Sequence, residues 1–536
     1  MGRQLNAVAR RLRTLLLAAL VAAAALADSR PALAAGDAPT YDIRLCCQLC
    51  PKAADPASYA GSSYLEEFRV LEQGRDGWLF RSGIDMTTDI EIGDASIAQL
   101  RRLAAALRAR GSALVIVLQP PRALMDVDKL SDAQRKRYDF AAAKRSYVSA
   151  LQKIRLAGVT VAPVDELIDE HKGYEYFFRR DHHWTPDGAK HTADVVAAAI
   201  RKLPAFKDVP RKSFVTHPAS LIGKPGTLQK VATQICGGSY SMQYVDGDIT
   251  EPAGGGDAGA LLGDGGDASA SDDASGGGLL DVAGKPDDGG GLLGNGGGDG
   301  GDVPQIVLLG TSNSDTKGGY NFNGYLEQAL GADVLDTALS GGSFDGSLLH
   351  YLPSDLYQKH PPKIIVWEIP WQNWPGASKN PYKTYRQAVP LVHDGCEGRP
   401  AVLSNSIDLK AGSNELLFNG GGAAQPLTGA HYWLDLQFDD PTIKDLHAVI
   451  WYFSGQKESL KMHFNQYVDN GGRFVTELRN NRPDYAKATF MGATIELDRP
   501  PAKPLRVTAR VCEAEGPPGQ QAARQTAILE RHDVDD

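Results

Sequence analysis

Beyond its first 26 residues, the sequence lacks any apolar run that could cross a membrane. A membrane-spanning helix needs roughly 18 or more consecutive apolar residues, and no later segment of the 536-residue chain reaches that length. The sequence also lacks a block of basic residues of the kind that binds phosphate backbones, and its net charge is −9. We therefore expect neither an integral membrane protein nor a nucleic-acid-binding protein.

The first 35 residues, in contrast, carry the three parts of a secretory signal peptide. Four arginines form a basic start, an apolar run follows at 15–26, and Ala-Leu-Ala at 32–34 is a small-x-small cleavage site. The apolar run is too short for a stable membrane span. We therefore expect residues 1–35 to be removed and the mature protein to be soluble outside the cytoplasm.

Cysteine is scarce, and its pattern does not predict a zinc site. Cys47 and Cys50 form a CxxC pair, but no second CxxC and no Cys/His cluster completes a tetrahedral set of ligands. In an exported chain an even number of cysteines indicates disulfides, with a redox pair at Cys47 and Cys50 as the alternative. The six cysteines are Cys46, Cys47, Cys50, Cys236, Cys396 and Cys512. The residues alone leave their pairing open.

Residues 110–370 alternate short apolar strands with helices of amphipathic spacing. The helix expected from Pro186 has Thr185 as its N-cap and proline at its first position, a favoured arrangement. This alternation predicts an α/β domain over residues 40–390, with a mostly parallel sheet and helices on both faces. Strands are expected at 113–118, 159–164, 305–309, 334–338 and 364–369, and helices at 141–156, 186–203 and 322–330.

A Gly- and Asp-rich stretch at 252–302 interrupts this alternation. Twenty of its 51 residues are glycine, so it cannot bury enough apolar surface to offset the entropy of ordering. We expect a disordered surface insertion. A calcium-binding repeat is the alternative, although no nonapeptide period holds.

After about residue 395 the hydrophobic period changes from that of helices to that of strands. Five short segments alternate apolar and polar residues, with turn signals between them. This pattern predicts an all-β sandwich over residues 395–515, followed by a disordered tail at 516–536. Cys396 and Cys512 bracket the segment, and a disulfide between them would close the domain at its two ends.

Ser312 follows the expected strand 305–309, in the turn Gly310-Thr311-Ser312. A serine at the carboxyl end of a sheet strand, on a glycine-containing turn, projects its hydroxyl above the sheet. Neighbouring backbone N–H groups can then receive a developing oxyanion. The pattern indicates a nucleophile. The alternatives are an ordinary strand-end turn and a competing role for Ser314.

Asp181, His182 and His183 lie just before the helix expected from Pro186. A carboxylate two residues from a histidine can orient the imidazole and stabilise its protonated form during proton transfer. The positive end of the helix favours a neutral imidazole that can act as a base. The alternatives are a metal site formed by the three residues and a purely structural loop.

These segments fall at carboxyl-end loops of the same expected sheet, where catalytic sites are built. Gly341 and Gly342 lie on another loop of that edge, after the next strand. Together with the amide of Ser312 they are candidate oxyanion donors, and a tight turn that requires positive φ is the alternative. We therefore predict a serine centre made of Ser312, His183 and Asp181.

Three short segments together carry a family resemblance. They are residues 73–80 (QGRDGWLF), 180–185 (RDHHWT) and 310–314 (GTSNS). In combination they resemble the AlgX/AlgJ family of alginate O-acetylation proteins, which are SGNH-hydrolase-like. As in that family, Asp-x-His precedes the serine, whereas ordinary SGNH esterases place the serine first. The β-rich segment resembles the AlgX members, which add a carbohydrate-binding module that the AlgJ members lack.

The resemblance implies a periplasmic O-acetyltransferase that acts on alginate, an anionic polymer containing mannuronate, during biosynthesis and export. It assigns the nucleophile to Ser312, the general base to His183 and the orienting acid to Asp181, and it gives His182 no role. The expected partners are the polymer, an acetyl donor or donor protein, and other proteins of alginate biosynthesis and export. No metal and no cofactor are expected.

The resemblance also implies two disulfides. One joins Cys396 to Cys512. The other joins Cys236 to one of the three early cysteines, of which Cys50 is the expected partner. All four cysteines would then be oxidised, as is usual for an exported protein.

Four tryptophans are candidates for contact with sugar rings. Trp433 and Trp451 lie in the β-rich segment, and Trp371 and Trp374 lie just past the expected strand 364–369, where they could line a catalytic cleft. Burial in the core is the alternative, because aromatic side chains dominate protein cores by area. The competing functions are an acetyl esterase with the same triad and a non-catalytic scaffold that holds the polymer.

Overall fold

The computed structural model describes residues 48–170, 173–238, 240–253, 303–374, 382–422, 424–429 and 431–514. The expected signal peptide and C-terminal tail, Cys46 and Cys47, and residues 254–302 of the Gly/Asp-rich stretch lie outside the described residues. Leu49–Gly238 and Met242–Asp536 belong to one unit, whose described residues are considered below. Within the described ranges, no helix is long and apolar enough to span a membrane.

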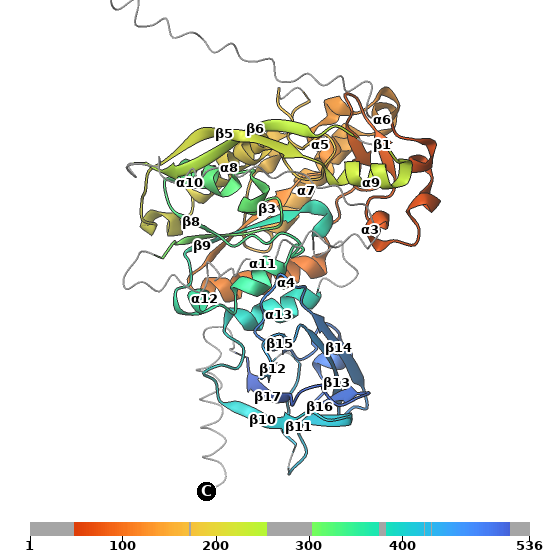
Figure 1. Cartoon of the computed structure of the whole chain (residues 1–536). Coiled ribbons are helices and arrows are strands. Elements are labelled where there is room, and N and C mark those ends of the chain that lie inside the picture. The colour runs from red at the N-terminus through yellow and green to blue at the C-terminus, as the bar shows by residue number, and fades with distance from the viewer. Residues whose placement is uncertain are drawn as a thin grey trace, which may run out of the picture. The chain divides into compact units, whose positions relative to one another are not determined.

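A five-stranded parallel sheet forms the centre of the first domain, in the strand order β4-β3-β9-β7-β8 (Figure 1). Every residue of β7 and β9 is buried, because helices cover both faces, and this explains their continuous apolar sequences. All five strands overlap those expected, so the mostly parallel sheet is confirmed. The strands are β3 (Ala113–Gln119), β4 (Thr160–Val161), β7 (Ile306–Leu309), β8 (Val334–Asp336) and β9 (Ile364–Pro370).

Helices lie on both sides of this sheet. On one side are α7 (Phe140–Arg155), α8 (Pro186–Ile200) and α10 (Phe322–Leu330), and on the other are α4 (Asp94–Ala109), α11 (Gly346–Tyr351) and α13 (Tyr382–Val392) (Figure 1). The side chain of Thr185 caps α8 by accepting a hydrogen bond from Gly188 N at 3.1 Å. Helix α13 was not expected from the sequence. It is buried along nearly its whole length and so has no polar face for periodicity to reveal.

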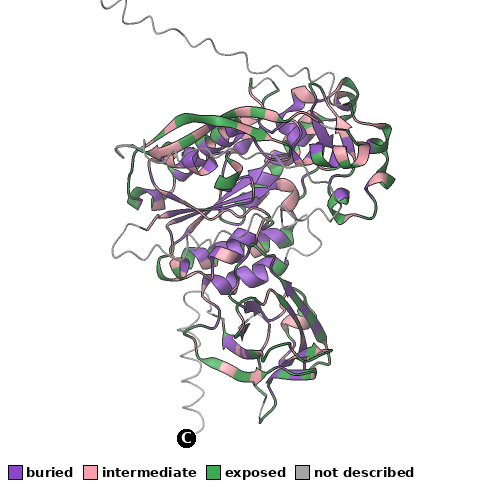
Figure 2. Ribbon diagram, in the orientation of Figure 1, coloured by how far each residue is buried: buried purple, intermediate pink, exposed green. Residues whose placement is uncertain are grey.

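A long antiparallel ribbon precedes the Gly/Asp-rich stretch and was also not expected from the sequence. Its strands are β5 (Phe214–Lys224) and β6 (Gln243–Pro252), with helix α9 (Thr227–Cys236) between them. Most ribbon side chains are exposed or only half-buried (Figure 2). Without a buried face, the strands lack the clear apolar alternation by which a strand is recognised.

The second domain is a sandwich of two four-stranded antiparallel sheets, as expected. Its strand orders are β10-β17-β12-β15 and β11-β16-β13-β14. Burial alternates residue by residue along β14, which is the pattern of a sheet with one face in the core. The strands are β10 (Ala401–Asp408), β11 (Gly412–Phe418), β12 (Tyr432–Phe438), β13 (Asp445–Tyr452), β14 (Lys457–His463), β15 (Arg473–Glu477), β16 (Phe490–Leu497) and β17 (Arg506–Glu513).

Polar contacts link the sandwich to the first domain. Arg386 on α13 is buried, forms an ion pair with Glu458 on β14, and donates from Nε to the backbone oxygen of Glu477 at 2.5 Å. Asn465 Nδ2 donates to the backbone oxygen of Gly341 at 2.8 Å. The sandwich therefore contacts both a helix of the first domain and one of the loops predicted to form the active site.

The remaining α-helices and strands are short, and several of them support the loops described below. They are α3 (Ser63–Glu66), α5 (Arg122–Met125), α6 (Asp132–Arg137), α12 (Asp355–Lys359), α14 (Pro483–Ala486), β1 (Leu71–Gln73) and β2 (Leu79–Arg81), with β1 and β2 paired antiparallel. Helix α5 is fully buried despite its four-residue length. Its first residue, Arg122, has a central place in the site.

Candidate active site

The turn that carries Ser312 leaves the carboxyl end of β7 and is tightly packed. The amide of Ser314 donates to Thr311 O at 3.0 Å and closes the turn. A Cβ atom at Gly310 would lie 2.7 Å from Ser314 Cβ and 3.1 Å from Glu368 Oε2. The turn therefore requires glycine at this position, which fits the Gly310-Thr311-Ser312 pattern seen in the sequence.

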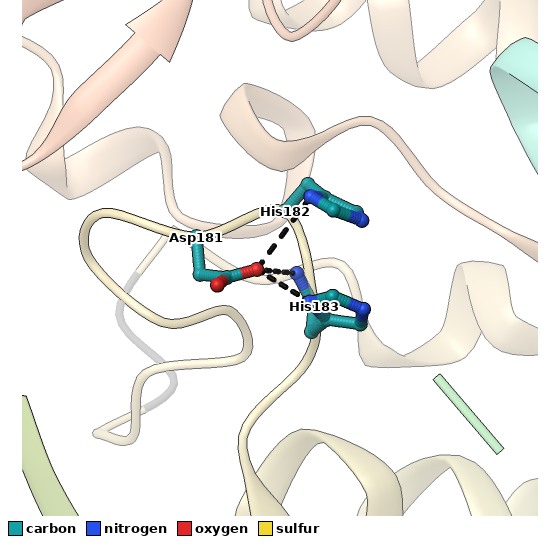
Figure 3. Close-up of side chains that lie close together, drawn as sticks. All are labelled: Asp181, His182 and His183. Carbon is teal, nitrogen blue, oxygen red and sulfur yellow. Dashed lines mark hydrogen bonds and ion pairs between the residues drawn. The ribbon is translucent and has the colours of Figure 1, made fainter. Parts of the chain in front are cut away.

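The structure brings Ser312, His183 and Asp181 together. His183 Nε2 lies 2.7 Å from Ser312 Oγ, and His183 Nδ1 lies 2.5 Å from Asp181 Oδ1 (Figure 3 shows the Asp181 side). If the imidazole carries its proton on Nδ1, facing the carboxylate, Nε2 is free to accept the serine proton. Ser314 has a different partner, because its Oγ lies 3.2 Å from Glu368 Oε2. The geometry therefore favours Ser312 over Ser314 as the nucleophile.

Asp181 is held by backbone amides on both of its oxygens. Oδ1 accepts from His183 N and Oδ2 accepts from Thr227 N, each at 3.0 Å. Burial raises the pKa of this carboxyl, but the charge and hydrogen bond of His183 outweigh burial and hold the pKa well below its usual value. Asp181 is therefore ionised at neutral pH and can stabilise a protonated His183.

Arg122 holds the loop of Asp181 and His183 through the loop's backbone. The guanidinium is buried and donates to the carbonyl oxygens of Phe178 at 2.9 Å and Arg179 at 3.2 Å, and to that of Asp181. It also donates to Leu79 O on β2 at 3.0 Å. Phe178 O and Arg179 O also accept from the backbone amides of Asp181 and Leu79, so one planar group with several fixed donors adds a second hydrogen bond to these carbonyls and supplies the donor to Asp181 O.

His182 contacts two members of the triad, because its ring centre lies 4.0 Å from that of His183 and its Nδ1 lies 3.6 Å from Asp181 Oδ1. Its Nδ1 lies 2.7 Å from Thr227 Oγ1. Burial, followed by the charge of His183, holds the pKa of His182 well below its usual value, so the ring is neutral. Asp181, His182 and His183 offer potential metal-ligand atoms within 4.8 Å of one another (Figure 3). A metal ligated there by His183 would displace a hydrogen bond to Asp181 or Ser312, so the observed bonds favour proton transfer.

A pocket of about 470 Å³ opens beside Ser312. Gly341, with φ of +75°, lines this pocket, and the positive φ explains the glycine. Among the described residues, the amides of Ser312 and Gly341 have no acceptor. The amide of Gly342 instead donates to Leu339 O at 3.1 Å within its own turn. The amides of Ser312 and Gly341 therefore remain candidates for binding an oxyanion, whereas the amide of Gly342 already has an acceptor.

Glu368 is a site residue that the sequence reasoning missed. It lies on β9 with no exposed surface, and its Oε2 accepts from Thr311 N at 2.8 Å, Thr311 Oγ1 at 2.9 Å and Ser314 Oγ at 3.2 Å. Burial raises its pKa to about 7. Its Oε1 has no partner among the described residues. The signal was present in the sequence, because Glu368 is the only charged residue in a strand that is otherwise apolar.

The four tryptophan candidates do not line the pocket beside Ser312. Trp374 is 1% exposed, and Trp433 is 3% exposed and packs against Cys396 and Cys512. Their expected role in sugar contact is therefore corrected to one in the core, as large aromatic surfaces favour burial. Trp371 and Trp451 are half-buried, and Trp451 Nε1 donates to Thr494 Oγ1 at 3.0 Å.

Two disulfides join the pairs that the resemblance implied. Cys396 is bonded to Cys512, and Cys50 is bonded to Cys236. The second bond has a direct relation to the site, because Cys236 is the last residue of α9 and Thr227, the first, donates to Asp181. It anchors the far end of a helix whose first residue helps to hold the Asp181 carboxylate.

Comparisons with known proteins agree with this architecture. A family model described as an SGNH hydrolase-like domain of the acetyltransferase AlgX matches residues 71–270 and 281–371. A model described as a C-terminal carbohydrate-binding module matches residues 395–527. The two models thus correspond to the α/β domain and the sandwich.

Individual relatives extend over most of the chain. The alginate biosynthesis protein AlgX of Pseudomonas aeruginosa is 39% identical over 498 residues, which cover 93% of this chain and 95% of the relative. A solved structure of Pseudomonas aeruginosa AlgX aligns with a TM-score of 0.72 at 38% identity, covering 87% of this chain and 100% of that one. The probable alginate O-acetylase AlgJ of the same organism is 27% identical over 334 residues, covering 57% of this chain and 70% of the relative. The chain therefore belongs to the AlgX family, with an SGNH-hydrolase-like domain followed by a carbohydrate-binding module.

Proposed function

We propose that this chain is a periplasmic O-acetyltransferase that carries an acetyl group on Ser312 and transfers it to mannuronate hydroxyls of alginate. The observation that carries the proposal is the continuous path of hydrogen bonds from Asp181 through His183 to Ser312. Membership of the AlgX family and the carbohydrate-binding module support a polysaccharide acceptor. Similarity to a probable alginate O-acetylase supports acetyl transfer.

In the first half-reaction, Ser312 takes the acetyl group from an ester donor. His183 Nε2 accepts the Oγ proton while Oγ attacks the carbonyl carbon, and Asp181 stabilises the imidazolium that forms. The amides of Ser312 and Gly341 are the proposed donors to the oxyanion. The tetrahedral intermediate then collapses, and the leaving oxygen takes the proton from His183. The products are acetyl-Ser312 and the deacetylated donor.

In the second half-reaction, a sugar hydroxyl repeats these steps in reverse. It gives its proton to His183 and attacks the acetyl carbon, and Ser312 leaves and recovers a proton from His183. The pocket of about 470 Å³ beside Ser312 falls within the usual size range of small-ligand sites and has room for a sugar unit. Transfer therefore requires that a hydroxyl of the polymer occupy this pocket in preference to water.

The disulfides support the proposed location. Cys50–Cys236 and Cys396–Cys512 are both formed, and such bonds persist in oxidising compartments such as the periplasm. The expected signal peptide would direct the chain there. Other proteins of alginate biosynthesis and export, including the donor of the acetyl group, are the proposed partners.

Incubation of the protein with a neutral acetyl ester, with and without oligomannuronate, tests the proposed function. We expect acetylated oligosaccharide in the presence of the acceptor, and Ser312→Ala should abolish it. Ser404→Ala, which removes an exposed serine on β10, is the matched control and should retain transfer. Acetate release at the same rate with and without oligomannuronate would instead identify an esterase. Transfer that survives Ser312→Ala would refute the serine mechanism.

A further inference from the structure

A second pocket, of about 430 Å³, is lined in part by the Asp181–His183 loop. Ser312 and His182 line the first pocket, whereas His183 and Asp181 line the second. The hydrogen bond between His183 Nε2 and Ser312 Oγ, at 2.7 Å, joins the two linings. The charge of the second pocket therefore bears on which acceptors can be placed at Ser312.

Three lysines from three separate segments line this second pocket. Lys224 ends β5, Lys230 lies on α9, and Lys317 lies in the short 3-10 turn Thr316–Gly318 that follows the nucleophile turn. We call Lys224, Lys230 and Lys317 the lysine pocket. The chain as a whole has a net charge of −9, so this local excess of positive charge contrasts with the overall composition.

The ammonium groups of the lysine pocket have no acidic partners in contact. Among the described residues, no carboxylate oxygen lies within 4.0 Å of any of the three nitrogens. Lys224 is half-buried, donates to the Tyr320 hydroxyl, and lies 4.8 Å from the centre of that ring. Asp181, the one carboxylate that lines the pocket, already accepts hydrogen bonds from His183 and Thr227.

Lys230 and Lys317 are exposed and Lys224 is half-buried. Several cations around a concave site attract anions, because their fields add and the protein surface focuses them. Burial lowers the pKa of Lys224, with the charge of Asp181 acting in the opposite direction. An anion placed between the three segments would offset the cost of desolvating that ammonium. Lysine binds carboxylates and phosphates as a point charge, without demanding bidentate geometry.

We propose that the lysine pocket binds the carboxylate of an acidic sugar adjacent to the one acetylated at Ser312. The inference rests on the proposed function and adds a subsite to it: the lysines hold the charge of the neighbouring unit, so a charged acceptor is preferred to a neutral one. A polymer with a carboxylate on each unit presents a charge beside every reacting hydroxyl. One unit can therefore occupy the first pocket while its neighbour is held by the lysines.

The test compares oligomannuronate with the same oligosaccharide after chemical reduction of its carboxylates to neutral alcohols. The variants are the double substitution Lys230→Ala/Lys317→Ala and a control of equal charge loss, Lys202→Ala/Lys207→Ala, at exposed positions that line neither pocket. The readout is the ratio of transfer rates to the charged and neutral acceptors. We expect the first double variant to lower this ratio by about tenfold, the scale of losing one or two charge-assisted contacts. The control should not lower it.

Increasing salt should lower the same ratio for the unmodified protein, because screening weakens exposed charge pairs. A ratio that is unchanged by Lys230→Ala/Lys317→Ala would overturn the proposal. The alternative ligand of the lysine pocket is an anionic group on the acetyl donor. If the double variant slows acylation by 4-acetoxybenzoate relative to neutral 4-nitrophenyl acetate and leaves the acceptor ratio unchanged, the pocket serves the donor and the proposal is wrong.

The inference and the proposed function fail in different ways. Transfer by the unmodified protein to both acceptors, with no effect of the lysine substitutions, refutes only the lysine pocket. Transfer to neither acceptor refutes the proposed function. In that case direct titration with oligomannuronate decides the pocket, which is supported if Lys230→Ala/Lys317→Ala weakens binding and overturned if it does not.

Discussion

The loop that carries His183 and the turn that carries Ser312 meet at one hydrogen bond, yet opposite kinds of side chain hold them. Arg122 donates to backbone carbonyls of the histidine loop. Glu368 accepts from an amide and two hydroxyls of the nucleophile turn. Neither Arg122 nor Glu368 forms a hydrogen bond with the side chain of Ser312 or His183. Both instead bond to the groups around these two side chains. A buried donor and a buried acceptor thus position one site.

The carboxyl groups on the two sides of the site, Asp181 and Glu368, also differ in their pKa. The charged state dominates on the histidine side, where Asp181 has a pKa well below its usual value. On the serine side, burial raises the pKa of Glu368 to about 7. The histidine loop should therefore depend on fixed charge, whereas support of the nucleophile turn should change with pH near neutrality.

Asp181→Asn should have the largest effect, because it removes the fixed charge on the histidine side and replaces one of two acceptor oxygens with a donor. We expect kcat for acetyl transfer to fall roughly 10³- to 10⁴-fold, the scale of losing the orienting carboxylate in a serine triad. Steady-state kinetics and a urea unfolding curve measure the two consequences separately. A fall of less than about tenfold with unchanged stability would mean that His183 does not depend on Asp181.

Arg122→Met should come next, since it removes buried hydrogen bonds to four carbonyls and the buried ion pair with Asp85 at 3.4 Å. We expect a loss of about 3 kcal/mol or more in the free energy of unfolding and a loss of roughly 10²-fold in kcat from a displaced loop. Arg101→Met is the control, because exposed Arg101 also donates to a carbonyl, Leu156 O at 2.9 Å. Equal effects of the two substitutions on stability would contradict the special role of burial.

Glu368→Gln tests the serine side, and its signature is a pH dependence. The folded-state pKa of about 7 exceeds the value near 4.3 of an unfolded glutamate. The stabilisation associated with the proton on Glu368 is therefore complete below about pH 4 and declines as pH rises to about 7, by roughly 4 kcal/mol in total. We expect this decline to disappear in Glu368→Gln, which keeps an acceptor oxygen.

The measurement is the difference in unfolding free energy between the native protein and Glu368→Gln at about pH 4.5, 6 and 8. Because glutamine retains the acceptor, kcat should fall only several-fold, whereas Glu368→Ala should lower it further by leaving the Thr311 amide unpaired. A difference in stability that does not vary with pH would show that Glu368 does not titrate in this range.

Of the changes considered, removal of a disulfide should have the smallest effect on kcat. The effect should differ between the disulfide of the α/β domain and that of the sandwich. Cys50→Ala/Cys236→Ala and Cys396→Ala/Cys512→Ala should each cost about 2–4 kcal/mol in stability. Only the first pair should lower kcat, by a few-fold, because α9 connects Cys236 to the Thr227 amide that holds Asp181. An equal loss of kcat in both variants would contradict this connection.

The sequence could predict the parts of this architecture that have a strong local pattern. The inner strands β3, β9 and β7 are buried on both faces and appear as apolar runs. Ser312 and the Asp181–His183 pair lie beside recognisable strand or helix ends. The ribbon β5–β6 has no such pattern, because most of its side chains are not buried. The reacting groups are therefore predictable from their positions beside the ends of well-patterned elements.

The supports could not be predicted in the same way, because they depend on contacts between distant segments. Arg122 lies on a helix of only four residues, too short for a period, and Glu368 contacts Thr311 across 57 residues of sequence. Trp374 and Trp433 were misassigned for a related reason, since burial of an aromatic depends on what packs over it. Local patterns indicate which residues react, whereas the folded chain determines what holds them.

The most direct test of the central claim is to trap the acetyl group on the protein. After brief exposure to a neutral acetyl ester without acceptor, we expect peptide mass spectrometry to find acetyl on Ser312 and not on Ser314, and addition of oligomannuronate to remove it with formation of acetylated sugar. Acetyl on Ser314, or catalysis with no adduct on either serine in a rapid quench, would contradict the proposed acyl-enzyme.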